Sequence, residues 1–168
     1  NFRFNQMPKE YILVILNNNN QLNKLSIITE LKSLNNSVLN KFNYQLVFLL
    51  HPFTDPLNFL FKKMKNNEFF FQNKRVVIIH KPNKLENIIK NSKFIVHLTS
   101  SLSAQTLLLN KKILCLGKNI IYIKNLKNVV SNISQNNLKF LNKKEDKKNN
   151  AEINKFLINY LSNTVNSR

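Results

Sequence analysis

Short, wholly apolar runs alternate with amphipathic helical patterns along most of this chain. YILVIL at 11–16 and QLVFLL at 45–50 are typical of strands that are buried on both faces. Between them, residues 22–42 carry apolar side chains at spacings of three and four, the pattern of a helix with one buried face. Strands of this kind that alternate with helices form a parallel sheet covered on both sides. We therefore predict a single doubly wound α/β domain over residues 1–168, with a mainly parallel, flavodoxin-like sheet.

The same alternation predicts the remaining elements. Asp55 and Pro56 mark the start of a helix at 56–66, since aspartate caps helices and proline suits their first turn. Next come extended segments at 68–71 and 75–80, a helix at 83–91, a strand at 93–98, a serine-capped helix at 100–110 and a strand at 112–117. The tail holds the apolar segments 120–123 and 138–141, a helix near 125–135, a solvated Lys/Asn loop at 142–150 and a C-terminal helix at 151–163.

The charge balance indicates an acidic partner. The 168 residues include 26 Lys and Arg but 8 Asp and Glu, which gives a net charge of +18. Nucleic acid is the commonest partner of such a chain. The basic residues are scattered instead of gathered in an amphipathic helix, so an anionic membrane surface is the weaker alternative. Because no apolar run approaches the roughly 20 residues of a membrane span and no signal segment opens the chain, we expect a soluble protein without a membrane partner.

The residue usage points to an extremely A/T-rich genome. The chain holds 32 Asn and 23 Lys but two Ala and three Arg. Such composition is typical of organelles and of reduced parasites or symbionts, and strongly basic organelle-encoded proteins are mostly ribosomal. We therefore predict a mitochondrial location, with a plastid-type organelle or a bacterial cytoplasm as alternatives. The single glycine, Gly117, counts against a nucleotide enzyme, because phosphate-cradling loops commonly need several glycines.

Three histidines follow or end predicted strands. His51, His80 and His97 are expected at the carboxyl edge of the sheet, where open α/β folds bind ligands. No carboxylate or cysteine stands at metal-ligand spacing from them, so we predict ordinary strand-end histidines and no metal site. Cys115, among strand-like apolar residues, is predicted to be a buried inert thiol.

The candidate nucleophiles lack a catalytic setting. Ser100, Ser101 and Ser103 have no flanking glycine to form a nucleophile elbow, and capping of the next helix accounts for at least one of them. No phosphate-binding loop, dinucleotide fingerprint or Cys/His metal pattern occurs. We therefore predict no catalytic residues, no cofactor and no enzyme activity.

The stretch FFFQNKR joins three phenylalanines to a basic pair. We expect Phe69–Phe71 to seal the sheet and Lys74 and Arg75 to emerge at its edge. Residues 45–75 resemble the strand, helix and aromatic-basic segment of the small-subunit ribosomal protein S-two family. Residues 23–32 and 92–119 are similar to further segments of that family, and LKFL with the final helix stands where its last strand and helix fall.

The S-two resemblance implies a structural constituent of a small ribosomal subunit. Its partners would be rRNA and neighbouring ribosomal proteins, with no small-molecule substrate. Basic side chains would contact RNA phosphates. The residues that we predict to bind RNA are Lys62, Lys63, Lys74, Arg75, Lys81, Lys84, Lys111, Lys112 and Lys118.

A second resemblance favours another function. Residues 81–122 are similar to the nucleotide-sugar half of capsule-type glycosyltransferases, and His51 and Pro52 match a His-Pro strand end of that pattern. Thr99 stands where that family has asparagine before its serine. The alternative is therefore the nucleotide-sugar-binding half of such an enzyme. An RNA-binding α/β module outside the ribosome is a third hypothesis.

Overall fold

The fold is one parallel sheet with helices on both faces, which confirms the predicted doubly wound α/β class. A computed structural model describes residues 3–4, 6–16, 25–65, 76–97, 102–116, 129–131, 134–143, 151 and 154–158. Within these residues, seven parallel strands pair in the order β1-β4-β3-β2-β5-β6-β7. The strands are β1 (Arg3–Phe4), β2 (Tyr11–Ile15), β3 (Gln45–Leu49), β4 (Val76–Ile79), β5 (Ile95–His97), β6 (Ile113–Cys115) and β7 (Val129–Val130).

The strand order reverses its direction at the centre of the sheet. From β2 onward it is the Rossmann order 3-2-1-4-5-6, in which the chain builds outward from β2 to β4 and then returns to the other side of β2. The reversal lies between β2 and β5, which pair Val14 with Val96 and Ile15 with His97. Ligands of open α/β sheets bind outside the carboxyl ends of strands at such a point.

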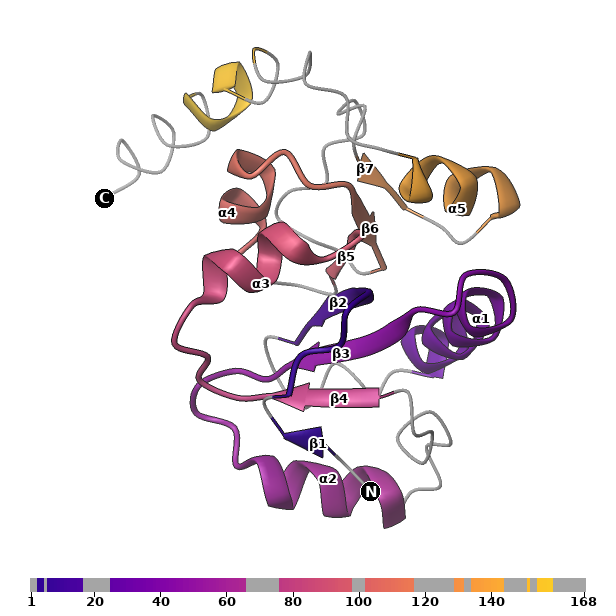
Figure 1. The fold of residues 1–168 in the computed structure, drawn as a ribbon, viewed down its shortest axis with the longest axis vertical. Helices are drawn as coiled ribbons and strands as arrows, with labels where there is room; N and C mark the ends of the chain where they lie inside the picture. The colour runs from indigo at the N-terminus through magenta and orange to yellow at the C-terminus, as the bar shows by residue number, and fades with distance from the viewer. Residues whose placement is uncertain are drawn as a thin grey trace.

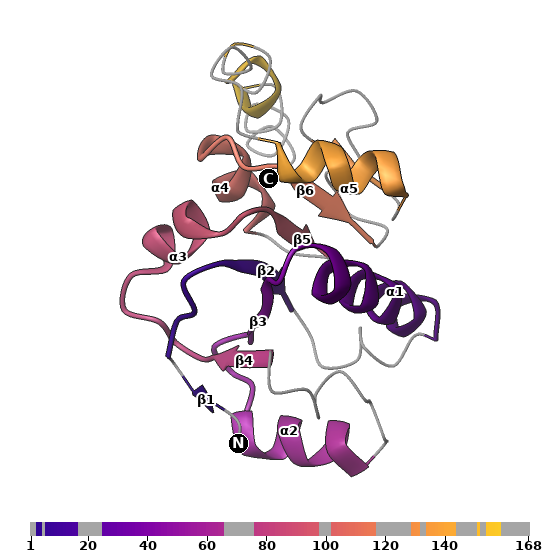
Figure 2. The same ribbon diagram turned by 45° about the vertical axis from the view of Figure 1, so that its right-hand side comes forward.

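Helices cover both faces of the sheet. They are α1 (Leu25–Lys41), α2 (Pro56–Lys65), α3 (Leu85–Asn91), α4 (Ser103–Leu108) and α5 (Gln135–Asn142). Figures 1 and 2 show α1 and α5 together on one side of the molecule and α3 and α4 together on the other. No helix in the described ranges is long and apolar enough to cross a bilayer.

Alternate residues of the strands belong to two separate cores. In β2, Ile12 and Val14 pack in a cluster that includes buried side chains of α1, α2 and α5. Leu13 and Ile15 pack in a second cluster that includes Ile89 of α3. Burial on both faces explains why these strands are continuous apolar runs.

The start of α2 is as predicted. Pro56 is its first residue, and the Asp55 Oδ1 atom accepts hydrogen bonds from the backbone N–H groups of Leu57 and Asn58 at 3.0 and 3.3 Å. The cap satisfies donors that have no partner inside the helix.

The predicted serine cap of α4 is wrong. Leu102 occupies the N-cap position of α4, and its side chain makes no capping hydrogen bond. A serine cap does occur at α5, where the Ser134 hydroxyl accepts a bond from the backbone N–H of Asn137 at 3.1 Å.

Two predictions for the tail are also wrong. Residues 129–130 form β7 where a helix near 125–135 was predicted. LKFL at 138–141 lies in α5 instead of a last strand, because Leu138 and Leu141 are one helical turn apart and are buried together against the sheet.

Several predicted segments lie wholly or partly outside the described residues. These are the aromatic-basic stretch 68–75, the serines at 100–101, the apolar segment 120–123 and most of the loop 142–150. Residue 151 and residues 154–158 are helical, within the predicted helix at 151–163, and Leu157 packs against Leu107 and Ile113. That the whole chain is a single domain stays a prediction.

Candidate functional site

A small, mainly apolar pocket lies at the carboxyl edge where the strand order reverses. Its volume is about 230 Å³. The ends of β2 and β3, the connection after β4, the side of α3 and the approach to α4 all contribute to its wall. The lining residues are Ile15, Leu16, Leu49, Leu50, His51, Pro52, Lys81, Pro82, Leu85 and Leu102. None of them is a carboxylate, so the pocket offers apolar surface, one imidazole and one ammonium group.

Backbone hydrogen bonds continue one residue beyond the ends of β2 and β3 and so fix the wall of this pocket. The N–H of Leu16 donates to the carbonyl of Leu49 at 3.0 Å, and the N–H of Leu50 donates to the carbonyl of Ile79 at 2.9 Å. Three neighbouring strand ends are therefore fixed relative to one another, as a binding site built on rigid elements requires.

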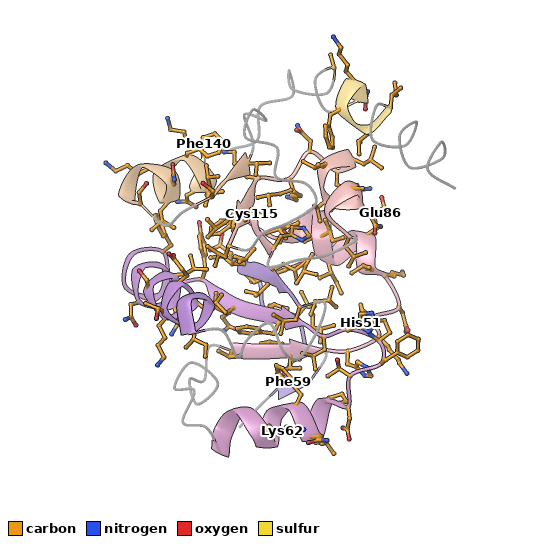
Figure 3. All side chains as sticks on the ribbon, turned by 180° about the vertical axis from the view of Figure 1, so that it is seen from behind. His51, Phe59, Lys62, Glu86, Cys115 and Phe140 are labelled. Carbon is orange, nitrogen blue, oxygen red and sulfur yellow. The ribbon has the colours of Figure 1, made fainter. Side chains whose placement is uncertain are left out.

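His51 and His80, the two half-buried histidines at this edge, have defined hydrogen-bond roles. The N–H of Phe53 donates to Nδ1 of His51 at 3.3 Å, so neutral His51 carries its hydrogen on Nε2. The Nε2 atom of His80 lies 3.0 Å from the carbonyl oxygen of Pro52, which can only accept, so this nitrogen is the donor. The His80 bond ties the connection after β3 to the end of β4. Figure 3 shows His51 at the end of the sheet toward which the β4 arrow points.

Lys81 adopts a left-handed backbone conformation beside the pocket. Its φ is 48°, and the other two non-glycine residues with positive φ among the described ones are Asn43 and Asn110. Asparagine tolerates this conformation, whereas for a lysine it costs about 1 kcal/mol. The turn at Lys81 brings an exposed ammonium group to the pocket at the point where β4 ends.

His97 is the buried member of the three. It is 0% exposed at the end of β5, and its Nε2 atom lies 3.0 Å from the hydroxyl oxygen of Thr106 on α4. Burial lowers its pKa to about 4, so the ring is neutral at physiological pH. The predicted carboxyl-edge position of His51, His80 and His97 is confirmed, but the three do not converge on one centre. Among the described residues no group of His, Cys, Asp and Glu could hold a metal ion.

Exposed apolar side chains flank the pocket. Phe53 is 92% exposed on the segment that joins β3 to α2, and Leu57 is 69% exposed in the first turn of α2. The Phe53 ring lies 5.3 Å from the His51 ring between centroids.

Those of the predicted RNA-binding residues that the structure describes lie in separate parts of the fold. Lys62 is exposed on α2 (Figure 3), and Lys81 and Lys84 are exposed after β4. Lys63 lies in α2, but the position of its side chain is not described. Lys74, Arg75 and Lys118 lie outside the described ranges.

Two of the predicted RNA contacts are interior residues. Lys111 and Lys112 are each 6% exposed. The Lys111 ammonium donates to the carbonyl of Ser92 at 3.0 Å, and that of Lys112 donates to the carbonyl of Phe140 at 2.7 Å. Their prediction as RNA contacts is wrong, because a buried ammonium bonded to carbonyls is not presented to a phosphate. They tie the residues just before β6 to the C-terminal end of α3 and to α5 instead. Cys115 is a buried thiol, as predicted.

Comparison with known proteins gives one kind of likeness. No protein-family model and no curated protein sequence matches the chain. The fold is similar to UDP-GlcNAc 2-epimerase from Methanocaldococcus jannaschii, with a TM-score of 0.61 and 18% identity over 86% of this chain and 42% of that one. A second structure of that enzyme, in complex with UDP-GlcNAc and UDP, gives a TM-score of 0.57 and 17% identity over 92% of this chain and 45% of that one. The chain thus spans less than half the length of these neighbours.

The ribosomal assignment is wrong. Both similar structures are of a nucleotide-sugar enzyme, and neither is ribosomal. The predicted rRNA and ribosomal-protein partners, and the predicted absence of a small-molecule substrate, are overturned with it. The resemblance to S-two rested on the order of apolar strands and helices, which all parallel α/β sheets share. The alternative hypothesis, a nucleotide-sugar-binding half, agrees better with these neighbours.

Sequence reasoning identified part of the pocket. His51 and Pro52 were recognised through their likeness to a glycosyltransferase strand end, and both line it. Pro82, Leu85 and Leu102 were missed, because each reads locally as an ordinary residue of a connection or a helix. The available signal was positional, since each of them closely follows a predicted strand.

Proposed function

We propose that this chain binds the nucleotide part of a nucleotide sugar at the carboxyl edge of its sheet. The observation that carries the proposal is the pocket at the carboxyl ends of β2 and β3, next to the reversal point between β2 and β5, in a fold shared with an enzyme that has been solved with UDP-GlcNAc and UDP. The chain would act as the nucleotide-binding half of a nucleotide-sugar enzyme.

The chemistry of the pocket suits a base with an adjoining phosphate. Leu16, Leu50 and Leu102 supply apolar surface against which a flat ring can pack. The Nε2–H of His51 can donate to a carbonyl or phosphoryl oxygen, and the Lys81 ammonium can pair with a phosphate. A glycine-rich loop is not required for this mode, since side chains meet the ligand.

The size of the pocket limits it to part of the ligand. Its volume of about 230 Å³ is below the usual range of roughly 300–1,000 Å³ for whole ligand sites. We therefore infer that the base lies in the pocket and that the sugar extends beyond it, toward the exposed Phe53 and Leu57. The proposal concerns binding alone. The predicted absence of enzyme activity and the predicted mitochondrial location therefore both stay predictions.

Removal of the Lys81 ammonium should weaken UDP binding by about tenfold, equivalent to roughly 1.4 kcal/mol. Lys81→Asn is the variant of choice, because asparagine tolerates the left-handed backbone and the fold is preserved. Calorimetric titration with UDP and with uridine separates the contribution of the phosphates from that of the base and ribose. The affinity for uridine, which has no phosphate, should not change.

Lys84→Asn is the matched control for this experiment. Lys84 is exposed and three residues away, but it does not line the carboxyl-edge pocket. Its replacement removes the same charge and should leave UDP binding unchanged. An absence of heat with both UDP and UDP-GlcNAc, or an equal loss in the two variants, would refute the proposed function.

A further inference from the structure

A second and larger cavity lies on the face of the sheet that carries α3. Its volume is about 600 Å³, within the range of whole small-molecule sites. Met7, Pro8 and Lys9 form one wall, the connection after β4 and one side of α3 form the other, and Tyr11 and Ile79 line the space between them. It shares only Lys81 and Pro82 with the carboxyl-edge pocket.

The charged residues that line this cavity are all lysines. Lys9, Lys81 and Lys84 line it, all three are exposed, and none is in an ion pair within the described part of the chain. No carboxylate lines it. Three unpaired ammonium groups around one cavity raise the local concentration of anions.

The acidic residues beside the cavity are neutralised by other lysines. Glu10 follows Lys9 but pairs with Lys93 at 2.6 Å, and Glu86 on α3 pairs with Lys90 at 2.5 Å. Tyr11 adds no negative charge, because burial raises its pKa to about 12 and its hydroxyl donates to the carbonyl of Ile88 at 2.7 Å. The lysines of the cavity therefore keep their charge available for a ligand.

The other polar groups of the cavity are amides. Asn87 and Asn91 are four residues apart on α3 and so share one face, and Asn83 lies just before that helix. Carboxamides donate and accept, so they match the hydroxyl groups of a sugar. Lysines match a phosphate or carboxylate on the same molecule.

We propose that this cavity, lined by Lys9, Lys81, Lys84 and the amides of Asn83, Asn87 and Asn91, is a second ligand site that binds an anionic sugar. The volume fits a phosphorylated or carboxylated saccharide of one or two rings. The site does not depend on the proposed nucleotide binding, because its two outer lysines, Lys9 and Lys84, do not line the carboxyl-edge pocket.

The test is titration of the whole chain with glucose 6-phosphate, glucuronate and glucose at physiological salt. We expect saturable binding of an anionic sugar and none of glucose, and the stronger of the two anions identifies the charged group. The double variant Lys9→Gln/Lys84→Gln should bind the anionic sugar about tenfold or more weakly. UDP binding by this double variant should equal that of the wild type.

A matched double variant excludes general attraction to a basic surface. Lys62→Gln/Lys139→Gln removes two exposed charges on α2 and α5, away from the cavity, and should leave the sugar affinity unchanged. Failure of the wild type to bind either anionic sugar, or an equal loss in the two double variants, would overturn the second site. Either result would leave the UDP titration as a separate measurement.

Discussion

Replacement of Phe48 by alanine is expected to lower the free energy of unfolding by about 3–5 kcal/mol. Phe48 is 0% exposed in β3 and packs in the cluster that joins the sheet to α1 and α2. The loss combines the transfer free energy of the ring with the cavity left behind. Because domains are commonly stable by only about 5–15 kcal/mol, this variant should be marginal at physiological temperature. Urea denaturation followed by circular dichroism measures it.

Phe53→Ala supplies the matched control. Phe53 has the same side chain five residues later but is 92% exposed, so its truncation should change the free energy of unfolding by no more than about 0.5 kcal/mol. Similar losses in the two variants would show that Phe48 is not buried between the sheet and the helices on its face. The Phe53 variant also isolates the exposed apolar surface beside the pocket for binding assays.

Lowering the pH from roughly 6.5 to roughly 4 is expected to reduce the free energy of unfolding by about 3 kcal/mol, because His97 binds a proton in the unfolded chain. Burial lowers the pKa of the folded imidazole to about 4, whereas the unfolded chain titrates near 6.5. In this window the unfolded state binds the proton and the folded state does not, so stability falls as the pH falls. Above about pH 6.5 both states are neutral and the contribution is complete.

His97→Gln tests the cause of this pH dependence. Glutamine does not titrate, and its amide can still bond to the Thr106 hydroxyl that lies 3.0 Å from His97. The variant should lose about 3 kcal/mol less than the wild type when the pH is lowered from about 7.5 to about 4. Parallel curves of unfolding free energy against pH would mean that His97 titrates normally in the folded state. The carboxylates are common to both proteins, so they cancel in the comparison.

The sheet was predictable because burial leaves a strong local signal. Strands such as β2 and β3 are buried on both faces and therefore appear as continuous apolar runs. The order of the strands carries no such signal, since it depends on pairings between residues far apart in the sequence. Short elements were the least predictable. Both β7 and α5 depend on contacts with β6 and the adjoining core instead of local propensity.

Charge was the most misleading property of the sequence. A count of basic residues does not distinguish Lys62, exposed on α2, from Lys112, whose ammonium is bonded to the carbonyl of Phe140 inside the fold. The scarcity of glycine is a similarly weak guide to the tight turns of the chain. The left-handed turns of the described chain are made by Asn43, Lys81 and Asn110, so tight connections at the sheet edges do not require glycine here.

The pocket itself could be anticipated only as a location. The sequence places His51 and Lys81 after strands, and parallel strands bring their carboxyl ends to one edge. It does not show that β2, β3 and β4 are adjacent, which is what brings Leu16, Leu50 and Pro82 together. The proposal of a nucleotide ligand came from the similar solved structures, whereas the resemblance to ribosomal protein S-two predicted rRNA.

The most direct test of nucleotide binding at the carboxyl edge is the map of backbone amide NMR shifts when UDP is added to the labelled chain. The two ends of the same strands provide an internal comparison. Leu16, Leu50 and His97 lie at the carboxyl ends of β2, β3 and β5, and Gln45 and Lys93 lie at the amino ends of β3 and β5. We predict saturable shifts at the first group and none at the second. Shifts at the amino ends, or equal small shifts spread over exposed lysines throughout the molecule, would contradict a nucleotide site at this edge.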